Sequence, residues 1–408
     1  MYVSGHPILL YIIIIYSICF LIKSKSKNEF LLIFTLFMFM IERNVWQNAI
    51  THLTEKPIRT QPTDISLIVL SFYIFSKILF NRNRLVLYNK AFFIFFVVII
   101  VYTFIGILNF GYSAIAEFRS VFYFTIIMLF IFLNVQENEM PYLIKKISSY
   151  LIPLILLVPI NLLLTQNFSY SVENRQFGAL MYQSIVLGFV SGSFYYYYYD
   201  KKYKLPLYFL FILLFMVPYT SHRTTWLSIF LMLPFLLYFL NLKKSFLVII
   251  ILLLLSFYLI NVDPYFLSER LKAFSDISED STGSWRLFVW NAVVKEASFW
   301  GKGIGARFIV YADIIGWDAL NGAHNGYIQI LYYTGYFGLF LFSLFLLISS
   351  ISLLKGSLNK NLIYEEKMII RLGFVSLISL LGYLMGYGFD IVSIIFISFA
   401  FKVYGKYL

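Results

Sequence analysis

The sequence is poor in cysteine and in charge. Its single cysteine, Cys19, excludes an internal disulfide and any metal site built from several cysteines. Only 13% of the 408 residues are charged and 61% are hydrophobic, whereas a soluble domain has about 25% charged residues. So large an apolar fraction cannot be buried inside one globule, and lipid must therefore surround most of the chain. These values exclude a cytosolic enzyme, a secreted domain and a nucleic-acid-binding protein, despite the net charge of +12.

Histidine is also scarce. The chain has four histidines, and none of them belongs to an HExxH or paired-carboxylate pattern. Metal sites in proteins need several such ligands at suitable spacing. The sequence therefore predicts no bound metal and no cofactor.

Long apolar runs, in contrast, recur along the whole chain. A membrane-spanning helix needs about 20 mostly apolar residues. Runs of this kind lie at about 7–22, 30–41, 64–80, 91–110, 118–134, 148–164, 177–199, 205–220, 224–240, 245–261, 327–353, 368–387 and 389–404. The run at 30–41 is short and leaves the count open between about 12 and 13. We therefore predict an all-α, polytopic integral membrane protein.

The basic residues indicate the orientation of these helices. Loops rich in lysine and arginine tend to face the cytoplasm. Basic connectors alternate with less basic ones, and they contain Lys23, Lys25, Lys27, Arg82, Arg84, Lys90, Lys145, Lys146, Lys201, Lys202, Lys204, Lys243, Lys244, Lys355, Lys360 and Lys367. The alternation places the N-terminus outside and the C-terminus inside. If 30–41 does not span, the N-terminus moves to the inside.

Arginine is distributed differently from lysine, because most arginines fall on the side predicted to face outward. A guanidinium group binds phosphate oxygens through two parallel hydrogen bonds. The enrichment therefore suggests an anionic, phosphorylated ligand at the outer surface. The alternative, that these arginines pair with outer acids such as Glu117, Glu173 and Asp263, stays open. The outer arginines are Arg43, Arg59, Arg119, Arg175, Arg223, Arg270, Arg286 and Arg307.

The one long hydrophilic connection spans 262–326 and divides the chain into an N-terminal bundle (1–261), an outer loop and a C-terminal group of helices (327–408). Loops longer than about 12–15 residues are usually functional or disordered. The spacing of its apolar residues predicts a helix that starts near Trp285, capped by Ser281, Thr282 or Ser284. We expect this helix to form a lid on the membrane surface. Its tryptophans would anchor it in the interface or, less favoured, stack on sugars.

Three residues near this loop are candidates for a catalytic or binding role. Arg223 lies at the outer junction of two apolar runs, Arg286 begins the lid helix, and His324 lies where the loop re-enters the membrane. A charge at such a junction suggests function when it faces the protein interior, and a histidine can accept a proton near neutral pH. The alternatives are that Arg223 reaches the lipid headgroups and that His324 is an ordinary interfacial side chain.

The run Gly301-Lys302-Gly303-Ile304-Gly305 resembles part of a phosphate-binding loop. No strand precedes it, and the full Gly-rich nucleotide patterns are absent. We therefore expect a hinge between the lid helix and the next segment.

Taken in order, these motifs resemble the O-antigen ligase/polymerase superfamily. The resemblance is carried by Ser221-His222-Arg223-Thr224-Thr225-Trp226, by Arg286 with its apolar followers, by the glycine run, by Ala323-His324-Asn325-Gly326-Tyr327 and by Gly335-Tyr336-Phe337-Gly338. The N-terminal half matches that superfamily only in hydropathy.

The resemblance implies a GT-C-type glycosyltransferase of the bacterial inner membrane, with one long periplasmic loop and a periplasmic active site. Its donor and acceptor would be undecaprenyl-diphosphate-linked oligosaccharides, with membrane lipids and a chain-length regulator as further partners. By similarity, Arg223 and Arg286 would hold the donor diphosphate and His324 would take the acceptor proton. Asn325, Arg175 and Tyr327 would complete the substrate-binding residues. No metal, nucleotide sugar or nucleic acid would take part.

Members of this superfamily differ mainly in their acceptor. An O-antigen polymerase joins lipid-linked repeat units, whereas an O-antigen ligase transfers the finished chain to lipid A-core. The richness in Phe, Tyr, Ile, Lys and Asn favours the polymerase, and the ligase stays the alternative. A lipid-linked oligosaccharide flippase is less favoured, because transporters tend to show matching halves and mid-membrane charges.

Overall fold

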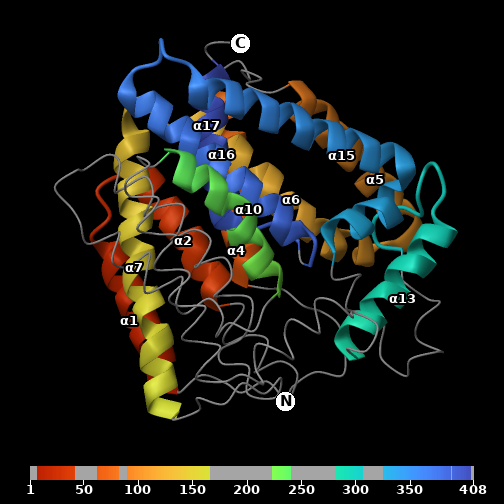
Figure 1. Cartoon of the computed structure of the whole chain (residues 1–408), viewed down its shortest axis with the longest axis horizontal. Coiled ribbons are helices and arrows are strands. Elements are labelled where there is room, and N and C mark those ends of the chain that lie inside the picture. Colours follow the sequence, from red (N-terminus) through yellow and green to blue (C-terminus); the bar gives the residue numbers. More distant parts are fainter. Residues whose placement is uncertain are drawn as a thin grey trace.

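The computed structural model describes residues 7–41, 62–81, 90–165, 223–239, 281–306, 325–386 and 388–405. Nearly all of them are helical, and no strand occurs among them (Figure 1). This architecture confirms the predicted all-α polytopic class. The predicted runs at 177–199, 205–220 and 245–261 lie outside the described residues.

Each predicted apolar run within the described ranges forms a helix. The N-terminal helices are α1 (Pro7–Ile22), α2 (Lys27–Ile41), α4 (Pro62–Asn81), α5 (Lys90–Phe110), α6 (Tyr112–Asn134) and α7 (Met140–Thr165), with a 3-10 turn η2 (Glu137–Glu139). The later helices are α10 (Arg223–Phe239), α13 (Ser281–Glu296), α15 (Gly326–Leu358), α16 (Tyr364–Leu384) and α17 (Ile391–Tyr404). Helix α7 begins before the predicted run because its first turns are amphipathic, with Leu143 and Ile144 buried and Lys145 exposed.

By length and composition, 4 helices of the described part can cross a membrane. These are Pro62–Leu79, Phe93–Phe110, Gly326–Leu358 and Tyr364–Leu384. Shorter apolar stretches occur in α1, α6, α10 and α17. Helix α5 exposes Phe104 and Leu108, and α4 exposes Phe72; outward apolar side chains of this kind suit a lipid surrounding.

Helix α16 is the centre of the C-terminal half and packs against α10, α15 and α17. Gly373 permits the close approach of α17, because a Cβ atom there would overlap the Ala400 side chain. The next residue, Phe374, meets Phe235 of α10 edge to face, with ring centroids 5.0 Å apart. A small residue therefore brings α17 close, and aromatic rings contribute to the contact with α10.

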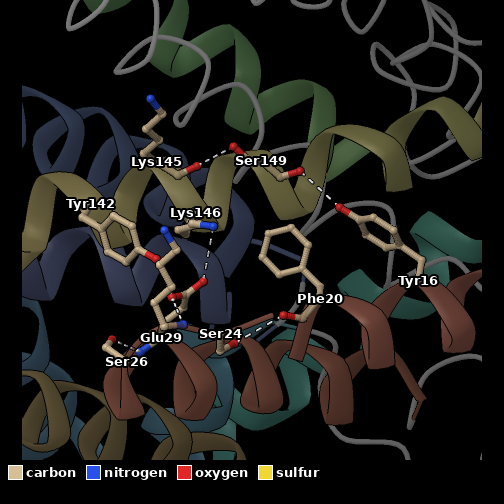
Figure 2. A network of polar contacts seen from close by, with 10 residues as sticks. Tyr16, Phe20, Ser24, Ser26, Glu29, Tyr142, Lys145, Lys146 and Ser149 are labelled. Atoms are coloured by element: carbon tan, nitrogen blue, oxygen red, sulfur yellow. Dashed lines mark hydrogen bonds and ion pairs between the residues drawn. The ribbon is translucent and has the colours of Figure 1, made fainter. Parts of the chain in front are cut away.

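A buried acid joins α2 to α7 (Figure 2). Glu29 is 1% exposed and accepts hydrogen bonds from the Tyr142 hydroxyl (2.7 Å) and the Lys25 amide (2.9 Å). The Lys146 ammonium lies 3.7 Å from its other oxygen. Burial and the hydrogen bond to Glu29 raise the pKa of Tyr142 to about 12, so the donor stays protonated at physiological pH. The charge on Glu29 is thus compensated, as a buried carboxylate requires.

A buried lysine closes the end of α6. Lys402, near the end of α17, is 7% exposed. Its ammonium donates to the carbonyls of Ile131 (3.2 Å), Phe132 (2.8 Å) and Val135. The last carbonyls of a helix have no intrahelical partner, and a cation there also opposes the helix dipole. Lys402 therefore satisfies the end of α6 and fixes α17 to it.

The contacts sort the helix ends into two groups. The first group contains the start of α2 and of α7 and the end of α6 and of α17, joined by Glu29 and Lys402. The second group contains the start of α6, where Ala114 lies against Gly305, and the start of α10 and of α15 beside the end of α16. Since α6 runs from one group to the other, the groups occupy opposite ends of the bundle. Its antiparallel order agrees with the alternation predicted from the basic loops.

We expect Lys402→Met to lower the free energy of unfolding by about 3 kcal/mol, because hydrogen bonds to a charged group contribute about 1.5–3 kcal/mol each and the substitution leaves carbonyls without partners. Thermal unfolding in detergent measures the effect. Lys355→Met is the matched control, since Lys355 is an exposed lysine in the last turn of α15. Equal stability of the two variants would contradict the assigned role.

Candidate functional site

The structure places four of the predicted site residues on three helices. Arg223 is the first residue of α10, Arg286 lies in the second turn of α13, and Asn325 and Tyr327 begin α15. His324 and Arg175 lie outside the described residues. His324 directly precedes Asn325 in the sequence.

The end of α16 brings the starts of α10 and α15 together. A Cβ atom at Gly386 would overlap the Thr224 side chain, and one at Gly382 would lie 2.8 Å from the Ser228 Cα atom. On α15, the Tyr327 hydroxyl donates to the Leu381 carbonyl at 3.2 Å. Arg223, next to Thr224 in the chain, and Asn325, two residues before Tyr327, therefore flank the same end of one helix.

Asn325 is the N-cap of α15. Its side-chain oxygen accepts hydrogen bonds from the Tyr327 amide (2.9 Å) and the Ile328 amide (3.2 Å), and the residue is 6% exposed. This bonding satisfies two of the free amides at the helix start. Because the oxygen is engaged in the cap, a substrate contact by Asn325 would use its amide NH₂ group. An asparagine just before an apolar run is a sequence signal for this cap.

Arg286 lies on the face of α13 that packs against the protein. Positions three and seven residues apart share one helix face, and Val289 and Val293, at those spacings from Arg286, are 3% and 1% exposed. Arg286 itself is half-buried. Within the described part of the chain it forms no ion pair.

The predicted lid helix exists, with a different start. Helix α13 begins at Ser281 rather than near Trp285, so Ser284, predicted as a cap, lies inside the helix. Ser and Thr in a first turn can bond to nearby backbone groups, and they tolerate this position. The Tyr336 hydroxyl of α15 donates to the Val294 carbonyl at 3.4 Å and joins the end of α13 to α15.

Two of the tryptophans in the outer loop have different surroundings. Trp290 is partly buried against the core. Trp300 is 64% exposed and packs against Phe299 and Phe337, with centroids 4.8 Å and 5.4 Å apart. The indole of Trp300 is therefore more accessible to a membrane surface or a sugar ring than that of Trp290. Trp317 lies outside the described residues.

The glycine run is a packed loop rather than a hinge. Its Ile304 carbonyl lies against Gly106 of α5, and Gly305 lies against Ala114 of α6. Gly303 donates its amide to the Tyr333 carbonyl of α15 at 2.9 Å. At the position of the expected hinge, contacts with three helices therefore hold the loop in this structure. The sequence showed the glycines but not their distant partners.

The described residues contain no group of three or more His, Cys, Asp or Glu side chains that could hold a metal ion. The described side chains at the shared end of α16 instead offer amide and hydroxyl groups, from Asn325 and Tyr327. Such groups bind oxyanions directly through charge-assisted hydrogen bonds.

Residues 208–343 match the protein-family model described as O-antigen ligase. The match covers less than half of the chain and includes Arg223, Arg286, His324, Asn325 and Tyr327, whereas Arg175 lies outside it. No curated protein matches the chain. Fold and match together define an all-α polytopic membrane protein with a segment that is similar to the O-antigen ligase family. The resemblance to the O-antigen ligase/polymerase superfamily is thereby confirmed.

We expect Asn325→Ala to destabilise the protein by about 1 kcal/mol, the usual cost of losing an N-cap side chain. Asn325→Asp keeps an oxygen at the same place and should retain the stability. Thermal unfolding of both variants tests the cap. A loss of activity in Asn325→Asp at unchanged stability would show in addition that the amide NH₂ group contacts substrate.

Proposed function

We propose that the protein is an O-antigen polymerase of the bacterial inner membrane. It would join undecaprenyl-diphosphate-linked repeat units at the periplasmic face by glycosyl transfer of the GT-C type. The observation that carries this proposal is the O-antigen ligase match over 208–343, which includes both candidate arginines and His324.

The reaction replaces one bond at the anomeric carbon by another. The acceptor hydroxyl oxygen attacks this carbon while the bond to the donor diphosphate breaks, and the diphosphate leaves with the electron pair. His324 takes the proton of the acceptor hydroxyl as general base. The undecaprenyl diphosphate is released, and the glycan on the acceptor is longer by the transferred chain.

Arg223 and Arg286 stabilise the negative charge that grows on the leaving diphosphate. Two unit charges 4 Å apart interact by about 4 kcal/mol at an effective dielectric constant of about 20. Cations held in place before the reaction need no reorganisation as this charge develops. Two arginines can therefore perform the role that a divalent metal has in other phosphate-releasing enzymes. Arg175 and Tyr327 are the further substrate contacts in this proposal.

Two structural findings support the assignment of these residues. Arg223 and Asn325 flank the same end of α16, and Arg286 lies on the packed face of the lid helix. The lysine-rich helix ends lie at the other end of the bundle, which suits a cytoplasmic position. In this orientation the arginines face the periplasm, where 262–326 is the lid between the membrane bundles 1–261 and 327–408.

The family description itself favours a second candidate, an O-antigen ligase that transfers the lipid-linked polysaccharide to lipid A-core. Both reactions use the same donor and the same leaving group. They differ only in the acceptor, so the assay must offer both acceptors. A polysaccharide chain-length regulator would be a partner of the polymerase alone.

The test uses the purified full chain in detergent with undecaprenyl-diphosphate-linked repeat units. A ladder of longer lipid-linked glycans identifies the polymerase. Transfer that occurs only after addition of lipid A-core identifies the ligase. Absence of both products with an intact fold would contradict glycosyl transfer and favour transport.

In the assay that gives product, we expect Arg286→Ala to lower kcat at least about 100-fold, the usual cost of removing one group that stabilises the transition-state charge. Arg286→Lys should restore part of the rate, because lysine keeps the charge but not the two-pronged hydrogen bonding. Lys295→Ala is the control, since Lys295 is an exposed cation on the same helix. An equal effect of Arg286→Ala and Lys295→Ala would contradict the proposed role.

A further inference from the structure

Helix α15 is interrupted at Gly335, whose backbone adopts φ 69° and ψ −171°. In an uninterrupted helix the amides of Tyr336 and Phe337 would bond to the carbonyls four residues earlier. Here Tyr336 donates to the Ser298 carbonyl (3.2 Å) and Phe337 to the Phe299 carbonyl (3.1 Å). Residues 298–303, which we name the clamp loop, supply both acceptors.

The clamp loop also satisfies the two helix carbonyls released by the break. The Tyr332 carbonyl accepts from the Lys302 amide at 3.0 Å, and the Tyr333 carbonyl accepts from the Gly303 amide at 2.9 Å. Two intrahelical hydrogen bonds are thus replaced by four bonds to the loop. The break leaves none of these backbone groups unpaired, which is the condition for an interrupted helix in an apolar surrounding.

Glycine is required on both sides of this contact. A Cβ atom at Gly301 would lie 2.5 Å from the Tyr333 carbonyl oxygen, and one at Gly335 would overlap the Gly301 amide nitrogen and the Phe299 carbonyl oxygen. Gly301 also has a positive φ of 75°, a conformation that only glycine adopts readily. No flexible side chain lies at these contacts to move aside, because the neighbours are backbone atoms.

Side chains strengthen the joint to the lid helix. Lys302 forms an ion pair with Glu296 at the end of α13, at 2.6 Å, and its ammonium lies 5.7 Å from the centroid of the Tyr332 ring on α15. With Ile304 against Gly106 of α5, the loop is held by the lid helix, by α15 and by the membrane bundle at once. The loop therefore cannot separate from α15 without breaking four backbone hydrogen bonds, and the Lys302–Glu296 ion pair ties the end of the lid helix to it.

We propose that Gly301 and Gly335 are positioning residues for the proposed glycosyl transfer, on which this inference rests. Their backbone contact fixes the loop that follows α13 to both segments of α15, so that α13 and α15 meet at a fixed angle. Arg286 on α13 and the Asn325 end of α15, which directly follows His324, thereby keep one separation throughout the reaction. Any opening of the site to substrate takes place outside the clamp loop.

The fixed angle is tested with spin labels in the otherwise unchanged clamp. The full chain carries Cys19→Ala with Asn291→Cys on the exposed side of α13 and Ser343→Cys on the exposed side of α15 beyond the break. Double electron–electron resonance should give one narrow distance that undecaprenyl diphosphate, added as the probe, does not change. Two distances, or a shift with the probe, would overturn the proposal.

The positioning role is tested by kinetics. Gly335→Ala and Gly301→Ala should each lower kcat at least tenfold, change the KM for donor much less, and broaden the spin-label distance. Gly388→Ala is the control, because a Cβ atom there has open space around it. Normal kcat with a narrow distance in either clamp variant would overturn the assignment.

The two readouts also separate this proposal from the proposed function. The distance does not depend on turnover. A narrow, probe-independent distance in a protein that transfers no glycan would contradict the glycosyltransferase and leave the rigid clamp in place.

Discussion

The structure depends on one constraint, that every backbone polar group in an apolar surrounding needs a partner. A continuous helix meets this demand along its length but not at its ends or at a break. At the end of α6, the Lys402 ammonium donates to three carbonyls, of which the Ile131 carbonyl also accepts from the Val135 amide. At the break in α15, the clamp loop supplies two donors and two acceptors. Both solutions join segments far apart in the sequence, so satisfying the backbone also builds the tertiary structure.

Helix α6 links these two solutions. Its start carries Ala114, which lies against Gly305 just after the clamp loop. Its end lies under Lys402 and thus against α17. The clamp loop, which follows the lid helix, is therefore connected through α6 to the opposite end of the bundle. Tight contacts of this kind transmit strain rather than absorb it, and this supports the rigid joint that we propose at the three glycines.

The sequence predicted the helices well, because the backbone groups of each helix bond to one another within the helix. A run of apolar residues is then enough to identify a helix. It predicted less where a partner comes from elsewhere in the chain. The amphipathic first turns of α7 are fixed by packing. The clamp depends on Gly301 meeting Gly335, and no local pattern encodes that pairing. The candidate site was predicted in part. The sequence motifs identified Arg223 and Arg286, whereas only the fold shows that Arg223 and Asn325 flank the same end of α16.

The unequal distribution of lysine and arginine has a chemical basis in this architecture. The three carbonyl oxygens at the end of α6 converge on a point, and an ammonium group on a flexible stem can donate to all of them. A planar guanidinium group would meet such a cluster less well. A diphosphate, in contrast, presents spread and paired oxygens that match the guanidinium fork. Lys402 at the converging carbonyls of α6 and the arginines at the proposed diphosphate thus each suit the shape of the oxygens that they bind in this arrangement.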